Sequence, residues 1–406
     1  MNGDGKLDLA VANACQNIQD GECYAPGEMA VLLGNGDGTF QPAVAYDTPG
    51  DGANLVAIAD LKGNGVLDLV VSIPCAEQSC DEGAVGVLLG NGDGTFQAAV
   101  LYNSNAGYAT GVAIGDANSD GIPDLIVASE ASKISVLLGN GDGTFQPAVT
   151  YATGCCEPSS VAVGDLRGDG MLDVVVTTEV SGSDAPSVQL LLGNGNGTFQ
   201  PPVVYNLVGA GRASVTIVDI NGDGVPDLIT VGDCEHRARY ECQGPGKANV
   251  LLGNGDGTFQ PAVGYSSGGF VGLAVVVGDV NGDGRPDIVA ANAQITKQSA
   301  DGSVAVLLNK TSYSTAIALI SSPNPAQANQ MVTLTAAVAS NPAVPNGETI
   351  TFYDGKSSLG TGTTTGGMAS LTTSFSKAKT YTIKATYPGD AFHKASTGTV
   401  KLIVNP

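Results

Sequence analysis

An Asp-, Asn- and Gly-rich segment recurs six times along the 406-residue chain, and no other feature restricts the possible folds as strongly. Its fullest form reads Asp279-Val-Asn281-Gly-Asp283-Gly-Arg-Pro-Asp287. Between the first aspartates of the last five copies, the steps are 56, 49, 54 and 60 residues. Self-similarity at such a period indicates a repeat architecture, in which each repeat is one small unit packed against its neighbours.

Three copies have the full spacing of a calcium-binding loop. Positions 1, 3, 5 and 9 are Asp, Asn, Asp and Asp, and calcium takes roughly six to eight oxygen ligands. The Gly after position 5 lets the backbone reverse, and the carbonyl of position 7 can supply a further ligand. The predicted calcium ligands are Asp116, Asn118, Asp120, Ile122 and Asp124, then Asp219, Asn221, Asp223, Val225 and Asp227, and then Asp279, Asn281, Asp283, Arg285 and Asp287.

The other three copies depart from this pattern. Lys62 and Arg167 place a basic side chain at position 3, where a ligand is expected. Either metal binding is weak in these two loops, or the basic side chain substitutes for the ion. The first copy lacks its first Asp position and leaves the question undecided. The weaker candidate ligands are Asn2, Asp4, Asp8, Asp60, Asn64, Asp68, Asp165, Asp169 and Asp173.

The segments that flank these loops predict strands. Val112-Ala-Ile-Gly precedes one full loop and Leu125-Ile-Val-Ala follows it, and short β-branched runs are typical of buried strands. An EF-hand would need a helix on each side, so the loop is predicted to be the turn of a β-hairpin. A metal-free Asp-Gly or Asn-Gly turn is the alternative interpretation, although such a turn does not need four oxygen donors at fixed offsets.

A second signature, Val31-Leu-Leu-Gly-Asn-Gly-Asp-Gly-Thr-Phe40, follows each loop and returns at 87–96, 136–145, 190–199 and 250–259. It is predicted to be another hairpin, running out from Phe to a Tyr five or six residues later. Without an Asp at position 9, it is interpreted as a structural turn. Four antiparallel strands in about 50 residues, repeated around a ring, describe a propeller blade.

The two signatures in register resemble the FG-GAP or VCBS repeats of the integrin α-chain propeller and of many bacterial surface proteins. The resemblance implies an all-β fold and calcium at the Asp and Asn positions of the full loops. It covers a predicted calcium-binding propeller at 1–312, with six visible four-stranded blades. Family propellers usually have seven blades, and we expect an N-terminally truncated chain, since roughly 20 upstream residues would complete six blades and roughly 70 would complete seven.

Residues 316–406 change character and predict a second domain. Thr and Ser dominate, and apolar and polar residues alternate in Met331-Val-Thr-Leu-Thr-Ala-Ala-Val. About seven short strands are expected, which favours a β-sandwich. Thr351-Phe-Tyr-Asp-Gly and Tyr387-Pro-Gly-Asp390 resemble the bacterial Ig-like domain of surface proteins, which implies a spacer or stalk.

Charge and composition exclude several partners. Residues 1–315 carry 36 acidic and 11 basic residues, whereas 316–406 carry 3 and 6. This acidic surplus argues against nucleic acid or an anionic membrane surface as the partner. The chain contains no run of 18 apolar residues, so no transmembrane segment is predicted.

Eight cysteines occur as sequence-local pairs, which favours disulfides formed in an oxidising compartment and a secreted or cell-surface protein. Zinc binding and free thiols are the alternatives, and the pairing of the two adjacent cysteines is open. The candidates are Cys15 with Cys23, Cys75 with Cys80, Cys155 with Cys156, and Cys234 with Cys242.

In an up-and-down blade both Gly-rich turns fall on one face, while the cysteines and the connections of variable length fall on the other. Variable loops on a rigid scaffold are where binding is expected, and integrin-type propellers bind ligand away from their calcium hairpins. A protein or glycan ligand is therefore expected on the face opposite the calcium hairpins. The candidate ligand contacts there are Tyr24, Tyr108, His236, Arg237, Arg239 and Tyr240.

Three functions fit these features. The leading hypothesis is a non-catalytic extracellular adhesion or binding module on an Ig-like stalk. The second is a glycan-binding lectin, although the chain has no Trp to stack on sugar rings. The third is a polysaccharide-active enzyme, as some propellers are. The chain has two histidines and no Gly-x-Ser-x-Gly motif, so an enzyme is the least favoured.

Overall fold

The computed structural model describes residues 1–14, 18–19, 22–23, 27–50, 52–76, 82–154, 156–179, 186–234, 236–238, 241–293, 301–340, 343–390 and 392–406. It divides into two compact units, Met1–Val218 with Pro226–Leu308, and Asp219–Val225 with Asn309–Pro406. Every regular element in the described ranges is a β-strand, which confirms the all-β prediction. No helix of the described part is long and apolar enough to cross a membrane.

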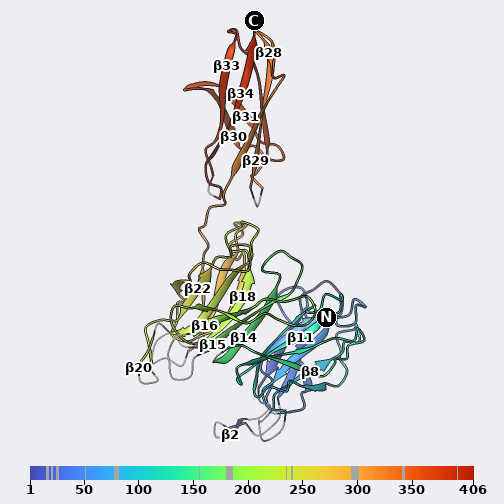
Figure 1. Cartoon of the computed structure of the whole chain (residues 1–406). Coiled ribbons are helices and arrows are strands. Elements are labelled where there is room, and N and C mark those ends of the chain that lie inside the picture. The colour runs from blue at the N-terminus through green and yellow to red at the C-terminus, as the bar shows by residue number, and fades with distance from the viewer. Residues whose placement is uncertain are drawn as a thin grey trace. The chain divides into compact units, whose positions relative to one another are not determined.

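Six antiparallel sheets follow one another along the first unit (Figure 1). Each sheet is a meander, and in the first and fifth sheets a small hairpin lies between two of its strands. The middle four have four strands, and the first and the sixth have three. In order, the sheets are β1 (Leu9–Asn13), β4 (Glu28–Leu32) and β5 (Val44–Asp47); β6 (Val56–Ala59), β7 (Asp68–Ile73), β8 (Ala84–Leu88) and β9 (Val100–Asn103); β10 (Ala109–Gly115), β11 (Asp124–Ser129), β12 (Lys133–Leu137) and β13 (Val149–Ala152); β14 (Glu157–Gly164), β15 (Asp173–Glu179), β16 (Pro186–Leu191) and β17 (Val203–Asn206); β18 (Ala210–Val218), β19 (Asp227–Cys234), β22 (Lys247–Leu251) and β23 (Val263–Ser266); and β24 (Gly272–Gly278), β25 (Asp287–Asn292) and β26 (Ser303–Leu307).

Each sheet corresponds to one sequence repeat. In the second to sixth sheets the Asp-rich loop is the turn of the first hairpin, and in the first sheet it precedes β1. Two-residue to three-residue strands form small hairpins inside two of the connections, β2 (Ile18–Gln19) with β3 (Glu22–Cys23) and β20 (His236–Ala238) with β21 (Glu241–Gln243). Among the described strands, no pairing joins the first sheet to the sixth. A closed propeller and its number of blades therefore stay predictions.

The strand that follows the second signature, which is the last strand of the first five sheets, is shorter than the sequence predicts. The predicted run begins at Phe, but in the third sheet Phe145 forms only an isolated bridge with Gly139, and β13 begins at Val149. Pro147 lies in between and has no N–H to donate to a ladder. The same gap contains Pro in four of the five copies of the signature. The second sheet has Ala98 and Ala99 instead and shows the same break, with Phe96 in an isolated bridge to Gly90 and β9 beginning at Val100.

The core of the first unit consists of clusters shared by consecutive sheets. In one cluster, Val70 and Val85 of the second sheet pack with Val112, Leu125 and Val127 of the third. The middle strands are buried along their whole length, as in β7, β8 and β11. Sheets covered on both faces read as near-continuous apolar runs, which is why the Val-Leu-Leu and Leu-Ile-Val segments do not alternate.

The second unit contains a β-sandwich of two sheets. The three-stranded sheet pairs β27 (Ala316–Ser322), β29 (Met331–Ala339) and β32 (Met368–Ser374), and the five-stranded sheet has the order β28 (Ala326–Gln327), β34 (Ser396–Asn405), β33 (Lys379–Tyr387), β30 (Thr349–Asp354) and β31 (Ser357–Thr363). Eight strands replace the seven predicted, because the two-residue β28 pairs in parallel with β34. Strand β29 alternates buried and partly exposed residues, with the apolar side in the core.

The motif around Asp390 closes one end of this sandwich. The Oδ1 atom of Asp390 accepts hydrogen bonds from the N–H groups of Phe392 and His393, at 2.7 and 2.6 Å. The hydroxyl of Tyr387, which is fully buried, donates to Oδ2 at 2.9 Å. The ring of His393 is also buried and lies 2.9 Å from Oδ2 through Nδ1. The Tyr-Pro-Gly-Asp segment therefore forms a structural turn.

Candidate functional site

The aspartate at position 9 of each loop is a buried structural residue. In the third sheet, Asp124 is fully buried. Its Oδ2 accepts a hydrogen bond from the N–H of Ala117 at 2.8 Å, and its Oδ1 accepts one from the N–H of Gly139 at 2.7 Å. Ala117 belongs to the Asp-rich loop and Gly139 to the second Gly-rich turn. One carboxylate therefore ties the two turns of a sheet together.

The same bond recurs in other sheets, and it places both signatures at the same end of each sheet, as the sequence predicts. A Cβ atom on Gly139 would collide with the carbonyl oxygen of Pro123, so the first Gly of the second signature is needed for this close approach. The equivalent bonds from Gly N–H to Asp Oδ1 join Gly34 to Asp8, Gly90 to Asp68, Gly193 to Asp173 and Gly253 to Asp227, at 2.7–2.8 Å.

The residues at positions 1, 3 and 5 hold the loop itself in shape. Asp116 accepts hydrogen bonds from the N–H groups of Asp120 and Gly121, at 3.1 and 2.7 Å. Asn118 accepts one from the N–H of Asp120 through Oδ1 and donates one to the Asp120 carboxylate through Nδ2. The equivalent bonds form in Asp219–Val225 and around Asp279.

Negative charge is concentrated in the full loop of the third sheet. Burial raises the pKa of the Asp124 carboxyl above its ordinary value, and the carboxylates of Asp120 and Asp116 raise it further. The N–H groups of Gly139 and Ala117 counteract this rise only in part. Within the described ranges, no three His, Cys, Asp or Glu side chains are grouped so as to hold a metal ion. The oxygen chemistry and the surplus charge of this loop nevertheless fit a hard cation.

In the two loops with a basic residue, that residue contacts the position 9 aspartate. The Lys62 ammonium lies 3.0 Å from Oδ1 of Asp68. The Arg167 guanidinium lies 2.8 Å from Oδ1 of Asp173 and also contacts Asp169 at 3.1 Å. The loop backbone is unchanged, because Asp60 and Asp165 accept hydrogen bonds from the N–H groups of positions 5 and 6 as Asp116 does.

One further cation was not anticipated from the sequence. In the sixth sheet the Arg285 guanidinium lies 3.2 Å from Oδ2 of Asp283. The sequence predicts that Arg285 contributes only its backbone carbonyl as a calcium ligand, because position 7 of calcium loops contributes backbone. Nothing in the sequence indicated that its side chain would contact Asp283.

Consecutive sheets are joined by an aromatic pair that the sequence analysis did not find. Tyr151 lies in β13, the last strand of the third sheet, and its ring packs edge-to-face on Phe199 of the fourth sheet, with centroids 5.4 Å apart. Its hydroxyl donates to the carbonyl of Gly197 at 2.9 Å. We call this arrangement the seam. Equivalent pairs are Tyr46 with Phe96, Tyr102 with Phe145, and Tyr205 with Phe259.

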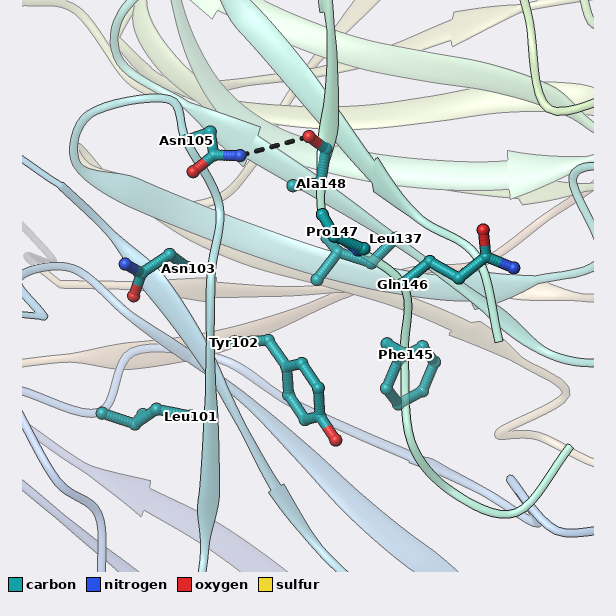
Figure 2. A pocket seen from close by; sticks show the side chains of 9 residues that line it. All are labelled: Leu101, Tyr102, Asn103, Asn105, Leu137, Phe145, Gln146, Pro147 and Ala148. Carbon is teal, nitrogen blue, oxygen red and sulfur yellow. Dashed lines mark hydrogen bonds between the residues drawn. The ribbon is translucent and has the colours of Figure 1, made fainter. Parts of the chain in front are cut away.

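A shallow cavity of about 380 Å³ opens beside the Tyr102 seam (Figure 2). It lies between β9 and the segment before β13, and Asn105 donates a hydrogen bond across it to the carbonyl of Ala148 at 3.2 Å. Its lining carries no charged side chain. The lining residues are Leu101, Tyr102, Asn103, Asn105, Leu137, Phe145, Gln146, Pro147 and Ala148.

The residues predicted for the opposite end of the sheets are described only in part. Tyr108 is 38% exposed and directly precedes β10. His236 and Arg237 lie in β20, which pairs with β21 so that Arg237 is opposite Cys242. Tyr24, Arg239 and Tyr240 lie outside the described residues.

The cysteines also fall in these connections. Cys75 follows β7 and Cys156 precedes β14, and both are disulfide-bonded. Cys15, Cys80 and Cys155 lie outside the described residues, and only the backbone of Cys23, Cys234 and Cys242 is described. The predicted pairing therefore stays a prediction.

The model of the FG-GAP-like repeat matches residues 1–71, 75–127, 116–176, 178–230 and 241–290, which is more than half of the chain. The chain belongs to the FG-GAP-like repeat family. A model of the bacterial Ig-like domain (group 3) matches residues 319–405, which contain most of the sandwich. The predicted combination of FG-GAP-like repeats and a bacterial Ig-like domain is confirmed.

Solved structures give distant similarities, and no curated protein matches the chain. The V. cholerae biofilm matrix protein Bap1 is 13% identical over 98% of this chain and 66% of its own, with a TM-score of 0.34. An exo-β-1,3-galactanase from Phanerochaete chrysosporium is 9% identical over 89% of this chain and 91% of its own, with a TM-score of 0.36. The extracellular domain of a putative one component system from B. thetaiotaomicron is 9% identical over 93% of this chain and 53% of its own, with a TM-score of 0.35. Similarities this distant carry no argument about function.

Proposed function

We propose that this FG-GAP-like repeat protein is a non-catalytic, extracellular or cell-surface binding and adhesion module. One observation supports this most directly: the two ends of the sheets differ. At one end, the same hydrogen bonds from Gly N–H to Asp recur in sheet after sheet. At the other end, the connections vary in length and carry the β2–β3 and β20–β21 hairpins. A uniform end serves the fold, and a variable end on a rigid scaffold serves binding.

We further propose that the sheets close into a propeller whose full loops hold calcium. The side chains that would hold it belong to positions 1, 3, 5 and 9, and the surplus negative charge around Asp124 supports the assignment. Calcium would supply positive charge that ties the loop oxygens together. The residues involved are Asp116, Asn118, Asp120 and Asp124, then Asp219, Asn221, Asp223 and Asp227, and then Asp279, Asn281, Asp283 and Asp287.

The remaining features fit a secreted or surface location. Local cysteine pairs, two of whose members are disulfide-bonded, favour an oxidising compartment. The Ig-like sandwich, with Thr and Ser on its exposed strands, would act as a spacer. Thr333 faces Thr372 and Thr335 faces Ser370 across β29 and β32, each pair at 3.1 Å, and such cross-strand pairs stabilise a sheet that faces water.

The binding proposal is tested with the full chain on a glycan array and on an array of secreted proteins, each with calcium and with EGTA. Saturable binding to a protein that is weakened by His236→Ala with Arg237→Ala supports the adhesion module. The matched control is Asp37→Asn, at the uniform end of the first sheet. Binding that is weakened only by the control contradicts the assignment of the binding end.

A glycan-binding lectin is the second candidate, and the cavity beside Tyr102 favours it. Its amide side chains and aromatic rings, without charge, suit a neutral polar ligand such as a sugar, which takes hydrogen bonds at its edges and ring contacts on its faces. In the glycan array, Gln146→Ala would weaken binding at this cavity, whereas Gln97→Ala, the same position one sheet earlier, would not. Turnover of an arrayed polysaccharide would favour the enzyme hypothesis instead.

A further inference from the structure

We propose that Lys62 and Arg167 are permanent internal cations, so that the loops of the second and fourth sheets hold their shape without metal and calcium loads only a subset of the repeats. The inference rests on the proposed calcium binding by the full loops. It concerns the choice, made at position 3 of each loop, between a neutral Asn and a basic side chain.

The Arg167 guanidinium occupies the centre of its loop. Nη2 lies 2.8 Å from Oδ1 of Asp173, Nε donates to Oδ2 of the same carboxylate at 3.3 Å, and Nη1 lies 3.1 Å from Oδ2 of Asp169. Nη2 also donates to the carbonyl of Gly193 at 2.8 Å. Asp169 and Asp173 stand at positions 5 and 9, which are metal positions in the full loops. The guanidinium therefore satisfies the same oxygens that would bind calcium.

In the second sheet the Lys62 ammonium makes the corresponding contacts to the position 9 carboxylate and to the facing turn. Its Nζ lies 3.0 Å from Oδ1 of Asp68 and donates to the carbonyl of Gly90 at 3.3 Å. Gly90 is the counterpart of Gly193 in the second signature. Lys62 and Arg167 thus contact the same two kinds of acceptor, a buried carboxylate and the carbonyl of the facing turn. We therefore infer that the two side chains have the same role in their loops.

The stems of both side chains are held between sheets. A Cβ atom added to Gly143 of the third sheet would lie 3.4 Å from Cγ of Lys62, and one added to Gly257 of the fifth sheet would lie 2.9 Å from Cγ of Arg167. The side chains are only 17% and 15% exposed. The charge cannot swing out into solvent without giving up this packing, so a calcium ion entering the loop would have to displace a packed, paired cation.

The full loops lack such a cation at position 3. Asn118 occupies that place in the third sheet and donates only one amide hydrogen bond to Asp120, at 2.8 Å. Arg167→Asn would turn the fourth loop into the full pattern, since Asp165, Asp169 and Asp173 are already in place. Asn118→Arg would make the opposite change in the third sheet. The two loops therefore supply a reciprocal test.

The experiment measures bound calcium per full-length chain by equilibrium dialysis and elemental analysis. We expect Arg167→Asn to bind one more ion than the wild type and Asn118→Arg to bind one fewer. The matched control, Arg167→Lys, keeps the charge and is expected to bind as the wild type does. If the wild type binds calcium but Arg167→Asn gains none, or Asn118→Arg loses none, the inference is overturned. A wild type that binds no calcium contradicts the proposed function instead.

A second readout does not depend on counting ions. In EGTA, Arg167→Asn is expected to melt at a lower temperature than Arg167→Lys, because the buried Asp173 carboxylate has lost its cation. Calcium should restore the melting temperature of Arg167→Asn and leave that of Arg167→Lys unchanged relative to the wild type. Equal melting temperatures of the two variants in EGTA would overturn the inference.

Discussion

The aspartate at position 9 has a structural role that the sequence does not reveal. Its spacing predicts a metal ligand, and its oxygens remain candidates for that role. The structure adds that its carboxylate already accepts two backbone N–H groups and ties two turns together, as Asp124 does with Ala117 and Gly139. The sequence offered no sign of this, because the partner Gly139 lies 15 residues away and donates only its backbone.

Asp68→Asn is expected to destabilise the protein with calcium and with chelator alike. The change removes the ion pair with Lys62 and brings an amide N–H toward the N–H of Gly90. Losing one partner of a buried pair costs about 3–5 kcal/mol, so the melting temperature should fall markedly. Asp93→Asn, in an exposed turn of the same sheet, is the control. A fall seen only in the presence of calcium would mean that Asp68 acts as a metal ligand.

The turn around Asp390 predicts a pH dependence for the sandwich. Burial raises the pKa of the Asp390 carboxyl, but hydrogen bonds from Phe392, His393 and Tyr387 outweigh this and hold it below its ordinary value. A carboxylate with a depressed folded-state pKa adds stability that is fully present above its unfolded value of about 4 and is lost as the pH falls through the folded value.

Asp390→Asn should therefore lower the melting temperature of the sandwich at pH 7, and the difference from the wild type should shrink below about pH 4. Thermal unfolding followed by tyrosine fluorescence at several pH values checks this. Asp354→Asn is the control, since its carboxylate is partly exposed and lies 3.9 Å from Lys379. A difference that is constant down to pH 2 would show that Asp390 acts through packing and not through its charge.

At the scale of elements, strand existence was predictable and the seam was not. Val-rich runs and Gly-rich turns have local signals, so the hairpins were found. The Tyr and Phe of a seam belong to different repeats, such as Tyr205 and Phe259, which are 54 residues apart. The sequence separation of the two aromatic residues is about the length of one repeat. Within a single repeat, neither residue can therefore be told apart from an ordinary strand residue.

A double-mutant cycle at one seam measures how strongly two sheets are joined. Tyr151→Phe removes the hydrogen bond to Gly197 and should cost about 0.5–1.5 kcal/mol. Phe199→Leu removes the edge-to-face contact. We expect Tyr151→Leu and Phe199→Leu to couple by about 0.5–1.5 kcal/mol in urea unfolding. Additive effects would show that the two rings contribute only through separate burial.

Two further differences between the predicted and the observed strands concern the backbone. The last strand is short in all five copies of the second signature; Pro follows Phe-Gln in four of them and cannot donate to a ladder, but the second sheet breaks in the same way with Ala98 and Ala99 there, so Pro is not the only cause. The eighth sandwich strand, β28, has only two residues and pairs with β34 from the far end of the domain. A two-residue segment has no periodicity, so no sequence pattern could have predicted it.

At the scale of the whole molecule, the two domains should respond differently to calcium. Calorimetry of the full chain is expected to show a transition for the repeats that moves to lower temperature in EGTA, and a transition for the sandwich that does not. Ligands that bind only the folded state stabilise it by mass action, and the Ig-like segment carries only three acidic residues, Glu348, Asp354 and Asp390. If both transitions shift together, the domains unfold as one unit; if neither shifts, calcium does not stabilise the repeats.

The family and the order of domains were predictable from the sequence because they depend on repeated motifs, and the matches to FG-GAP-like repeats and to a bacterial Ig-like domain confirm both. The binding partner was not predictable. Recognition would depend on a few side chains in connections that differ from one sheet to the next, such as Arg237 opposite Cys242. Features that occur only once cannot be found by comparing the repeats with one another.

The seam has a consequence for how such a chain can change in length. From the first sheet to the fifth, each sheet offers a Tyr and the next sheet offers a Phe, so the contacting surfaces of Tyr46 with Phe96 and of Tyr205 with Phe259 are interchangeable in kind. A duplicated repeat would therefore be able to form Tyr–Phe contacts with the sheets on both of its sides without further mutation. Stability that is a sum of nearest-neighbour contacts tolerates such events, so gene duplication could lengthen this protein one sheet at a time without redesign of its interior.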